Sequence, residues 1–333
     1  MNTKPSSTNG RTATFSRNLR LEALLKDINT SLWISEEKIL GSYQAMNFPV
    51  VLIMGPMRSG TTLLMQWLAN MDIVAYPTNL LSRFYQVPII GAKIQLLLTD
   101  PDYNFRDELG EFVQQAEYKS ENGKTKGVLG PNEFWYFWRR FLVESTRDVW
   151  SDDELRQSMD TQTMLAELAG MMDVFKKPFA AKGMLFNYNI PFLDSILEKV
   201  VFVQIKRDPV ANVASVLDAR KRQLGSEGAW YSFKIPEYEQ LKTLDPVVQA
   251  AGQVHFINQA VSKGLAEVAD ERKFSVDYEE FCANPAHLFV SLCDKLGYAD
   301  RPYTGPESFR TSRDLGERER AAIATALARF GYP

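Results

Sequence analysis

Short apolar runs alternate with longer amphipathic segments along the chain. The runs 50–54, 179–182, 200–205 and 274–276 are rich in apolar residues and are typical of buried strands. Segments between them, such as 151–176, begin with acidic residues and end with lysines, which favours a helix. Strands separated by helices predict a parallel sheet with helices on both faces. We therefore expect an α/β fold whose functional groups gather beyond the C-terminal ends of the strands.

The first apolar run leads into a turn that has the pattern of a phosphate site. Residues 55–62 read GPMRSGTT, and the apolar helical segment 63–68 follows them. A strand, a glycine-bounded turn and a helix N-terminus aim several backbone N–H groups at one point, which suits a phosphate. Nucleotide triphosphatases need a lysine where this chain has Thr61, and the cation here is Arg58, inside the turn. The pattern predicts an anion site unsuited to ATP hydrolysis, with an incidental strand-to-helix connection as the alternative.

A second anion site is predicted where the next long strand ends. Arg207 follows this strand directly, Asp208 is a good N-cap, and Pro209 suits the first position of a helix. Helical spacing places Ser215 on a small, polar face together with Ala211, Asn212, Ala219 and Arg222. A guanidinium and a hydroxyl over such a face suit a phosphate monoester, and pairing of Arg207 with a neighbouring carboxylate is the alternative. Two anion sites at neighbouring strand ends fit one ligand with phosphates at both ends.

Composition and charge exclude several classes of protein. The chain has 333 residues, a net charge of -3 and a mean hydropathy of -0.24, so no overall basic field draws it to nucleic acid. Its apolar run at 50–54 is far shorter than the ~18 residues that a membrane span needs. Residues 1–20 are polar and lack a secretory signal, so we interpret them as a flexible tail before one domain, 21–333. Cys282 and Cys293 are expected in one helix as reduced thiols, which favours a cytoplasmic protein.

Four segments, in order along the chain, resemble the sulfotransferases that use 3'-phosphoadenosine 5'-phosphosulfate (PAPS). Residues 56–64 are similar to the 5'-phosphosulfate loop, in the arginine-containing form of carbohydrate and protein-tyrosine sulfotransferases. Residues 201–215 resemble the 3'-phosphate motif of the family. Residues 181–193 are similar to the strand that carries its catalytic lysine, and residues 277–285 resemble its Tyr-Glu-Asp segment. Together the four matches are specific for this family.

The resemblance implies a P-loop, nucleotide-kinase-like parallel sheet flanked by helices, with helical insertions on the acceptor side. It implies donor-binding residues at Arg58, Ser59, Gly60, Thr61 and Thr62 for the 5'-phosphosulfate, at Arg207 and Ser215 for the 3'-phosphate, and at Tyr278 for the adenosine. Lys182 would face the transferring group as a catalytic residue, together with Arg58. The chain departs from the protein-tyrosine enzymes by having Asn79 where they place a glutamate base. It also lacks the Lys-Thr-His segment of the cytosolic enzymes, so the identity of the base is open.

Two residues are candidates for the general base. Glu133 precedes the aromatic segment 134–138, where partial burial would raise its pKa toward that of a useful base. Some bacterial members of the family have a glutamate in a similar context, and a helix-capping carboxylate is the alternative role. His255, in a helix that begins near Asp245, is the rival base, although such a lone histidine is more often packed or exposed. The chain has two histidines and neither a DxD nor an HExxH motif, so no metal site is expected.

Two aromatic-rich parts outside the sheet, about 79–175 and 225–246, are expected on the acceptor side. We expect Phe134 and Trp138 to belong to the core, and 225–246 to form a mobile loop over the site. The predicted function is sulfuryl transfer to a hydroxyl of a small molecule, glycolipid or carbohydrate, with a neutral acceptor favoured. A P-loop kinase or NTPase and a non-catalytic nucleotide-binding module are the alternatives.

Overall fold

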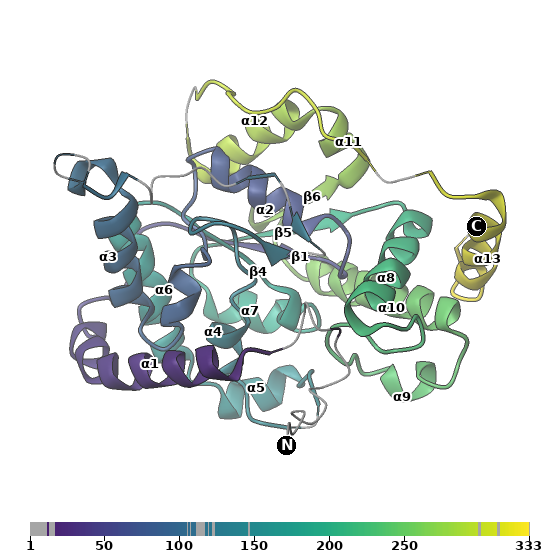
Figure 1. Ribbon diagram of the computed structural model, residues 1–333, viewed down its shortest axis with the longest axis horizontal. Coiled ribbons are helices and arrows are strands. Elements are labelled where there is room, and N and C mark those ends of the chain that lie inside the picture. Colours follow the sequence, from purple (N-terminus) through teal and green to yellow (C-terminus); the bar gives the residue numbers. More distant parts are fainter. Residues whose placement is uncertain are drawn as a thin grey trace, which may run out of the picture.

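Four parallel strands form the centre of the protein. A computed structural model describes residue 12 and residues 17–104, 106, 108–110, 117–118, 120–121, 124–145, 147–298, 301–311 and 314–332. The strands are β1 (Val50–Met54), β4 (Phe179–Lys182), β5 (Val200–Lys206) and β6 (Lys273–Asp277), in the order β4-β1-β5-β6 (Figure 1). Each neighbouring pair is parallel, and Val50 is in register with both Phe179 and Val200. The predicted α/β class and the four predicted strands are confirmed.

Helices cover both faces of this sheet, as Figure 1 shows. Val51 and Ile53 of β1 belong to a core that includes α2 (Thr61–Asn70), α11 (Tyr278–Ala283) and α12 (Pro285–Leu296). The alternate β1 residues belong to a larger core that includes α6 (Thr161–Phe175), α7 (Ile190–Ile196), α8 (Pro209–Leu224) and α10 (Pro246–Ala266). Because β1 is buried on both sides, its sequence is a continuous apolar run without polar alternation.

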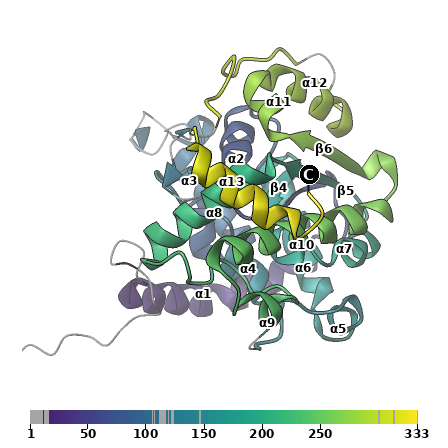
Figure 2. The same cartoon turned by 90° about the vertical axis from the view of Figure 1, so that its right-hand side faces the viewer.

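The remaining elements surround these two layers. The other helices are α1 (Leu19–Leu40), α3 (Pro88–Thr99), α4 (Trp135–Arg139), α5 (Asp152–Ser158), α9 (Tyr238–Leu241) and α13 (Glu317–Ala328). The short 3-10 helices are η2 (Leu81–Phe84), η3 (Pro101–Tyr103), η6 (Met184–Phe186) and η7 (Asp270–Arg272), and β2 (Ser120–Glu121) pairs with β3 (Lys124–Thr125). Helix α13 packs against α8 and α10 (Figure 2). Within the described residues, no helix has the length and apolar character needed to cross a bilayer.

Two segments that the sequence predicts as single helices are each broken in two. Segment 151–176 forms α5 and α6, because the Asp160 carboxylate accepts a hydrogen bond from the Thr163 N–H and starts a second helix. Cys282 lies in α11 and Cys293 in α12, since the Asn284 side chain caps α12 and a proline takes its first position. The expectation of one helix for both cysteines is therefore wrong, and both are free and buried.

The first helix starts inside the predicted flexible tail. Leu19 and Arg20 are helical, and the Asn18 side chain accepts a hydrogen bond from the Leu21 N–H. Residues 1–11 and 13–16 of the predicted tail lie outside the described residues. The helical part of the chain thus begins two residues before the predicted boundary.

Candidate active site

The turn after β1 contains three residues with positive φ. Gly55, Arg58 and Gly60 have φ angles of 144°, 64° and 102°. These angles are easy for glycine and cost free energy at Arg58. A Cβ at Gly60 would lie 2.2 Å from Cδ2 of Tyr278, so this position has room only for glycine. Strained backbone of this kind is characteristic of binding sites, where the surrounding structure compensates for it.

Two buried asparagines hold the turn in place. Asn187 donates to the Gly55 carbonyl oxygen at 2.9 Å and accepts from the Gly55 N–H at 3.0 Å. Asn212 of α8 donates to the Met57 carbonyl oxygen at 2.9 Å. The turn is therefore clamped to the segment after β4 and to α8. Asn187 was not among the predicted site residues. The only sign of it in the sequence is that it is a polar residue shortly after the strand that ends in Lys182.

The hydroxyl groups of the turn are arranged for an anion. The Oγ atom of Ser59 is fully buried and has no hydrogen-bond partner in the described structure. Thr61 and Thr62 begin α2, and its N-cap, Gly60, offers no side chain to the free N–H groups. An unsatisfied buried hydroxyl costs about 1–3 kcal/mol, which an anionic ligand oxygen would remove. Together with the helix N-terminus, this arrangement fits a phosphate or sulfate group.

The two predicted anion sites form one continuous site. Nε of Arg58 donates to Oγ of Ser215 at 3.1 Å. Nη1 of Arg207 donates to the Arg58 carbonyl oxygen at 2.5 Å, and its guanidinium lies 4.7 Å from the centre of the Tyr278 ring. Burial lowers the pKa of Arg207. Burial raises the pKa of Tyr278 to about 12, so Tyr278 is a neutral phenol at neutral pH. Side chains from three strand ends thus converge on one place.

Lys182 and Glu133 form an ion pair beside the turn. Nζ of Lys182 donates to Oγ1 of Thr62 at 2.8 Å and to Oε1 of Glu133 at 3.2 Å. The indole N–H of Trp135 donates to the other carboxylate oxygen, Oε2. Lys182 is the last residue of β4 and its side chain is only 3% exposed, whereas that of Glu133 is 35% exposed. The structure thus brings together three residues that the sequence proposed separately.

The pKa of Glu133 lies below its usual value. Burial raises this pKa, but the Lys182 ammonium, the hydrogen bond from Trp135 and the charge of Arg58 together outweigh burial. The expectation that burial would raise the pKa of Glu133 toward neutrality is therefore wrong. Glu133 is an ionised carboxylate at neutral pH and can accept a hydrogen bond from a hydroxyl on its exposed side.

A family model matches most of this chain. The model described as "Sulfotransferase family" matches residues 49–302, a range that holds the turn, Glu133, Lys182 and Arg207. The chain belongs to the sulfotransferase family. No curated protein sequence matches it.

Two solved sulfotransferase structures have a fold similar to that of this chain. Sulfotransferase STF9 from Mycobacterium avium is 16% identical, with a TM-score of 0.54, over 98% of this chain and 80% of that one. Sulfotransferase STF1 from Mycobacterium tuberculosis H37Rv is 16% identical, with a TM-score of 0.53, over 97% of this chain and 85% of that one. The likeness concerns the fold, and it confirms the P-loop-like α/β architecture.

Asn79 supports the segment that carries Glu133 in this sulfotransferase. Its Nδ2 donates to the Gly127 carbonyl oxygen at 2.9 Å, and its Oδ1 accepts from the Asn132 side chain at 3.0 Å. Asn132 in turn accepts from the Phe134 N–H at 2.9 Å. Asn79 is thus hydrogen-bonded directly to the residue that precedes Glu133.

His255 packs against the C-terminal part of the sulfotransferase chain. Its ring centre lies 5.4 Å from that of Phe330 and 5.6 Å from that of Tyr332, and burial lowers its pKa. In the described part of the chain, His255 makes no hydrogen bond or ion pair with Lys182 or Glu133. The structure therefore places one of the two candidate bases beside the lysine, and the role of either stays a prediction.

The aromatic segments of the sulfotransferase differ in their burial. Phe134 and Trp138 are 1% and 3% exposed, which confirms that they belong to the core. In the 225–246 segment, Phe233 and Ile235 are also buried, and its role as a mobile loop stays a prediction. Among the described residues, no group of three or more His, Cys, Asp and Glu is placed to hold a metal ion.

Proposed function

We propose that this family member transfers the sulfuryl group of PAPS to a hydroxyl of a small molecule, glycolipid or carbohydrate by in-line displacement. The contact between Lys182 and Glu133, next to Thr62 of the anion-binding turn, carries this proposal. A cation that stabilises the leaving oxygen and a carboxylate that receives the hydroxyl proton are the two groups this displacement needs. Both stand at the C-terminal end of β4, where ligands bind in open α/β sheets.

The residues around the turn fit a donor with phosphates at both ends. Arg58, Ser59 and the first turn of α2 would hold the 5'-phosphosulfate, and the unpartnered Ser59 hydroxyl supports this assignment. Arg207 and Ser215 would hold the 3'-phosphate. The hydrogen bond from Arg58 to Ser215 supports one ligand that spans both sites. The Tyr278 ring, packed on Gly60 and under Arg207, would lie beside the adenosine.

Lys182 would stabilise the charge that develops on the leaving oxygen. The bound donor supplies the sulfuryl group and that oxygen, a phosphate oxygen of the 5' end. Because the Lys182 side chain is almost fully buried, its charge acts in a medium of low dielectric and is worth more than in water. The hydrogen bond to Thr62 orients the ammonium toward the turn before any ligand arrives.

Glu133 would accept the proton of the acceptor hydroxyl. The proton moves from the hydroxyl oxygen to a carboxylate oxygen as the new S–O bond forms and the old S–O bond breaks. General base catalysis of this kind contributes about 100 to 10000-fold in rate. A weakly basic carboxylate suffices, since the hydroxyl becomes acidic only as its oxygen bonds to sulfur.

Two alternative functions explain fewer of the residues found in the site. A P-loop kinase or NTPase would need a lysine at the position of Thr61 and an aspartate after an apolar strand to hold magnesium, whereas β5 ends in Lys206 and is followed by Arg207. A non-catalytic nucleotide-binding module would not need the buried Lys182 with its carboxylate partner. Sulfuryl transfer gives a role to Arg58, Lys182, Glu133 and Arg207 together.

A cytoplasmic location and one domain over 21–333 belong to the same proposal. The free, buried thiols of Cys282 and Cys293 are compatible with a reducing compartment. The family match, 49–302, lies within the proposed domain.

A thermal unfolding experiment tests the proposed function. 3',5'-Bisphosphoadenosine without magnesium should raise Tm, with a stabilisation of about 2.7 kcal/mol at one hundred times Kd. ATP with magnesium should raise it much less, and preferential stabilisation by ATP with magnesium would overturn the proposal. In a second step, radiolabelled PAPS should label hydroxyl acceptors in the presence of the wild-type protein and fail to do so with Lys182→Ala.

A further inference from the structure

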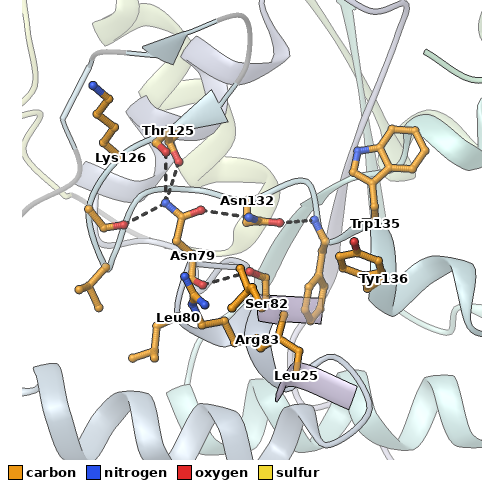
Figure 3. A pocket seen from close by; sticks show the side chains of 14 residues that line it. Leu25, Asn79, Leu80, Ser82, Arg83, Thr125, Lys126, Asn132, Trp135 and Tyr136 are labelled. Carbon is orange, nitrogen blue, oxygen red and sulfur yellow. Dashed lines mark hydrogen bonds between the residues drawn. The ribbon is translucent and has the colours of Figure 1, made fainter. Parts of the chain in front are cut away.

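A cavity of about 670 Å³ lies beside the segment that carries Glu133. Its walls come from α1, from the residues around η2 and from the segments 125–128 and 132–136 (Figure 3). Trp135 lines this cavity and also a second, small cavity whose walls include Glu133 and Lys182. A volume of this size is typical of small-molecule sites. The large cavity is therefore next to the proposed reaction centre and shares a wall with it.

Hydrogen bonds connect the segments that line the cavity. Asn79 donates to the Gly127 carbonyl oxygen and accepts a hydrogen bond from Asn132, so it connects segment 125–128 with segment 132–136. Figure 3 shows the bond between Asn79 and Asn132. Gly130 lies so close to Lys126 that a Cβ would be 2.4 Å from the Lys126 carbonyl oxygen. Phe134 has a φ of 57°, a strained value that its burial and the Asn132 hydrogen bond maintain. These contacts hold the lining segments in place around the cavity.

The lining is apolar at its centre and basic at one side. Its apolar side chains include Leu21, Leu25, Leu80, Val128 and Trp135, and it holds two basic side chains, Arg83 and Lys126, but no acidic one. In the described part of the chain, no carboxylate is paired with either of these exposed cations. In Figure 3, Lys126 and Trp135 lie on opposite sides of the pocket, with Asn79 and Asn132 between them.

One acidic residue lies near the edge of the cavity. Glu22 of α1 accepts a hydrogen bond from the Tyr136 hydroxyl at 3.5 Å. Its carboxylate is paired with Arg17 at 2.7 Å and therefore does not neutralise the charges of Arg83 and Lys126. The charge pattern of the cavity therefore complements an anion at the side away from Trp135.

We infer that the acceptor is an amphiphile with a hydroxyl at one end, an apolar body and a single negative charge at the other end. The inference rests on the proposed function, because the hydroxyl has to reach Glu133 past Trp135. The apolar body would cover Leu21, Leu25 and their neighbours, and the negative charge would lie near Lys126 and Arg83. Either cation can pair with a carboxylate by one charged hydrogen bond, whereas the described lining has no array of backbone N–H groups like that of the turn for a phosphate. This acceptor differs from the neutral one that the sequence favours.

A binding experiment tests the charge preference independently of turnover. The probes are ω-hydroxy fatty acids of graded length and the methyl esters of the same acids, which keep the body and the hydroxyl but lose the charge. Calorimetry on the protein saturated with 3',5'-bisphosphoadenosine measures their Kd for the wild type, Arg83→Gln, Lys126→Gln and the double variant. Lys26→Gln is the matched control, because Lys26 is an exposed cation of α1 that does not line the cavity.

We expect the best acid to bind about tenfold more tightly than its ester, a difference of about 1.4 kcal/mol that two partly exposed ion pairs can supply. In each single variant the ratio of the ester Kd to the acid Kd should fall about threefold. In the double variant this ratio should fall to about one, and in Lys26→Gln it should stay at the wild-type value. Equal affinity of acid and ester, no binding of any acid, or the same loss in Lys26→Gln would overturn the inference. Each of these outcomes leaves the proposed function standing if bisphosphoadenosine still stabilises the protein and labelled PAPS is still consumed.

Discussion

At the scale of single residues, two cations of the site have different tasks. Arg207 would contact a phosphate that does not react, so Arg207→Ala should raise the Kd of 3',5'-bisphosphoadenosine by about 10 to 100-fold, as expected for a lost charged hydrogen bond. Lys182→Ala should instead lower kcat by about 100 to 1000-fold, because its charge matters most as the leaving oxygen develops charge. Calorimetry and steady-state kinetics separate the two effects. Equal losses of affinity in both variants, with unchanged turnover of the bound donor, would mean that the roles are misassigned.

Glu133 is the residue on which the proposed mechanism depends most. Glu133→Gln keeps the shape but removes the basicity and one of the two hydrogen bonds, because the amide NH2 cannot accept from Lys182 or from Trp135. The kcat should therefore collapse by about 100-fold or more while donor affinity stays near wild type. His255→Ala should keep its turnover, since His255 packs on Phe330 and Tyr332. An active Glu133→Gln together with an inactive His255→Ala that still binds the donor would assign the base to His255.

The lowered pKa of Glu133 also predicts a pH dependence. The carboxylate loses its charge only as pH falls through a value below the usual glutamate pKa of about 4.3. Between pH 5 and pH 8, kcat/KM should therefore show no loss from Glu133, and the acid limb should lie below about pH 4.3. The ion pair with Lys182 is lost over the same range as the carboxylate is protonated. An acid limb near neutral pH that disappears in His255→Ala would contradict this assignment.

Gly60 has a conformation that other residues cannot adopt at this place. Gly60→Ala puts a Cβ into the Tyr278 ring at a φ of 102°, so it should lower the free energy of unfolding by about 1–3 kcal/mol and weaken bisphosphoadenosine binding. Gly41→Ala is the control, because Gly41 has a φ of -60° and no atom within 4 Å of the added Cβ. Chemical denaturation measures both variants. A Gly60→Ala protein as stable as Gly41→Ala would show that the turn is not constrained as described.

At the scale of elements, a buried ion pair connects the end of α4 to α6. Arg140 pairs with Glu167, whose side chain is fully buried, and donates to the Gln86 carbonyl oxygen at 3.0 Å. Burial lowers the pKa of Arg140 to about 10, so it is still a cation at neutral pH. Through this pair, α6 supports the helix that presents Trp135 to Glu133.

Two neighbouring arginines allow a matched test of this connection. Arg140→Ala leaves Glu167 buried without a counter-charge and should lower the free energy of unfolding by about 3–5 kcal/mol. Arg139→Ala removes an exposed pair with Asp148 and should cost about 0–1 kcal/mol. Urea unfolding of both variants gives the comparison. Similar costs for the two would mean that Glu167 finds another partner or is neutral in the native protein.

At the scale of the whole molecule, α13 lies beyond the residues that the family model matches, yet it packs on the helices that carry the site. Leu327 is 1% exposed, so Leu327→Ala should lower the free energy of unfolding by about 2–5 kcal/mol through the cavity it leaves. Donor affinity should change little, because Leu327 is not among the residues proposed to contact the donor. Thr325→Ala, an exposed site on the same helix, is the control for thermal unfolding. A Leu327→Ala protein with unchanged Tm would mean that α13 adds little to the stability of the molecule.

The sequence by itself determined the local features of this protein. The four strands, the turn at 55–62 and the start of α8 were predictable because each depends on residues close together in the chain. Capping broke two predicted helices, at Asp160 and Asn284, since a cap competes locally with an otherwise continuous amphipathic pattern.

Only the tertiary structure decided how the charged groups meet. The parallel order β4-β1-β5-β6 brings Lys182 next to Thr62 and Arg58 next to Ser215, although these partners are 120 and 157 residues apart in the chain. The pKa of Glu133 depends on which cations lie near it, and a sequence contains no distances between such groups. The cavity beside Trp135 likewise exists only because α1 folds back against residues 79–83 and 125–136. Electrostatic interactions depend on separation and burial in three dimensions, so the fold had to be known before this chemistry could be assigned.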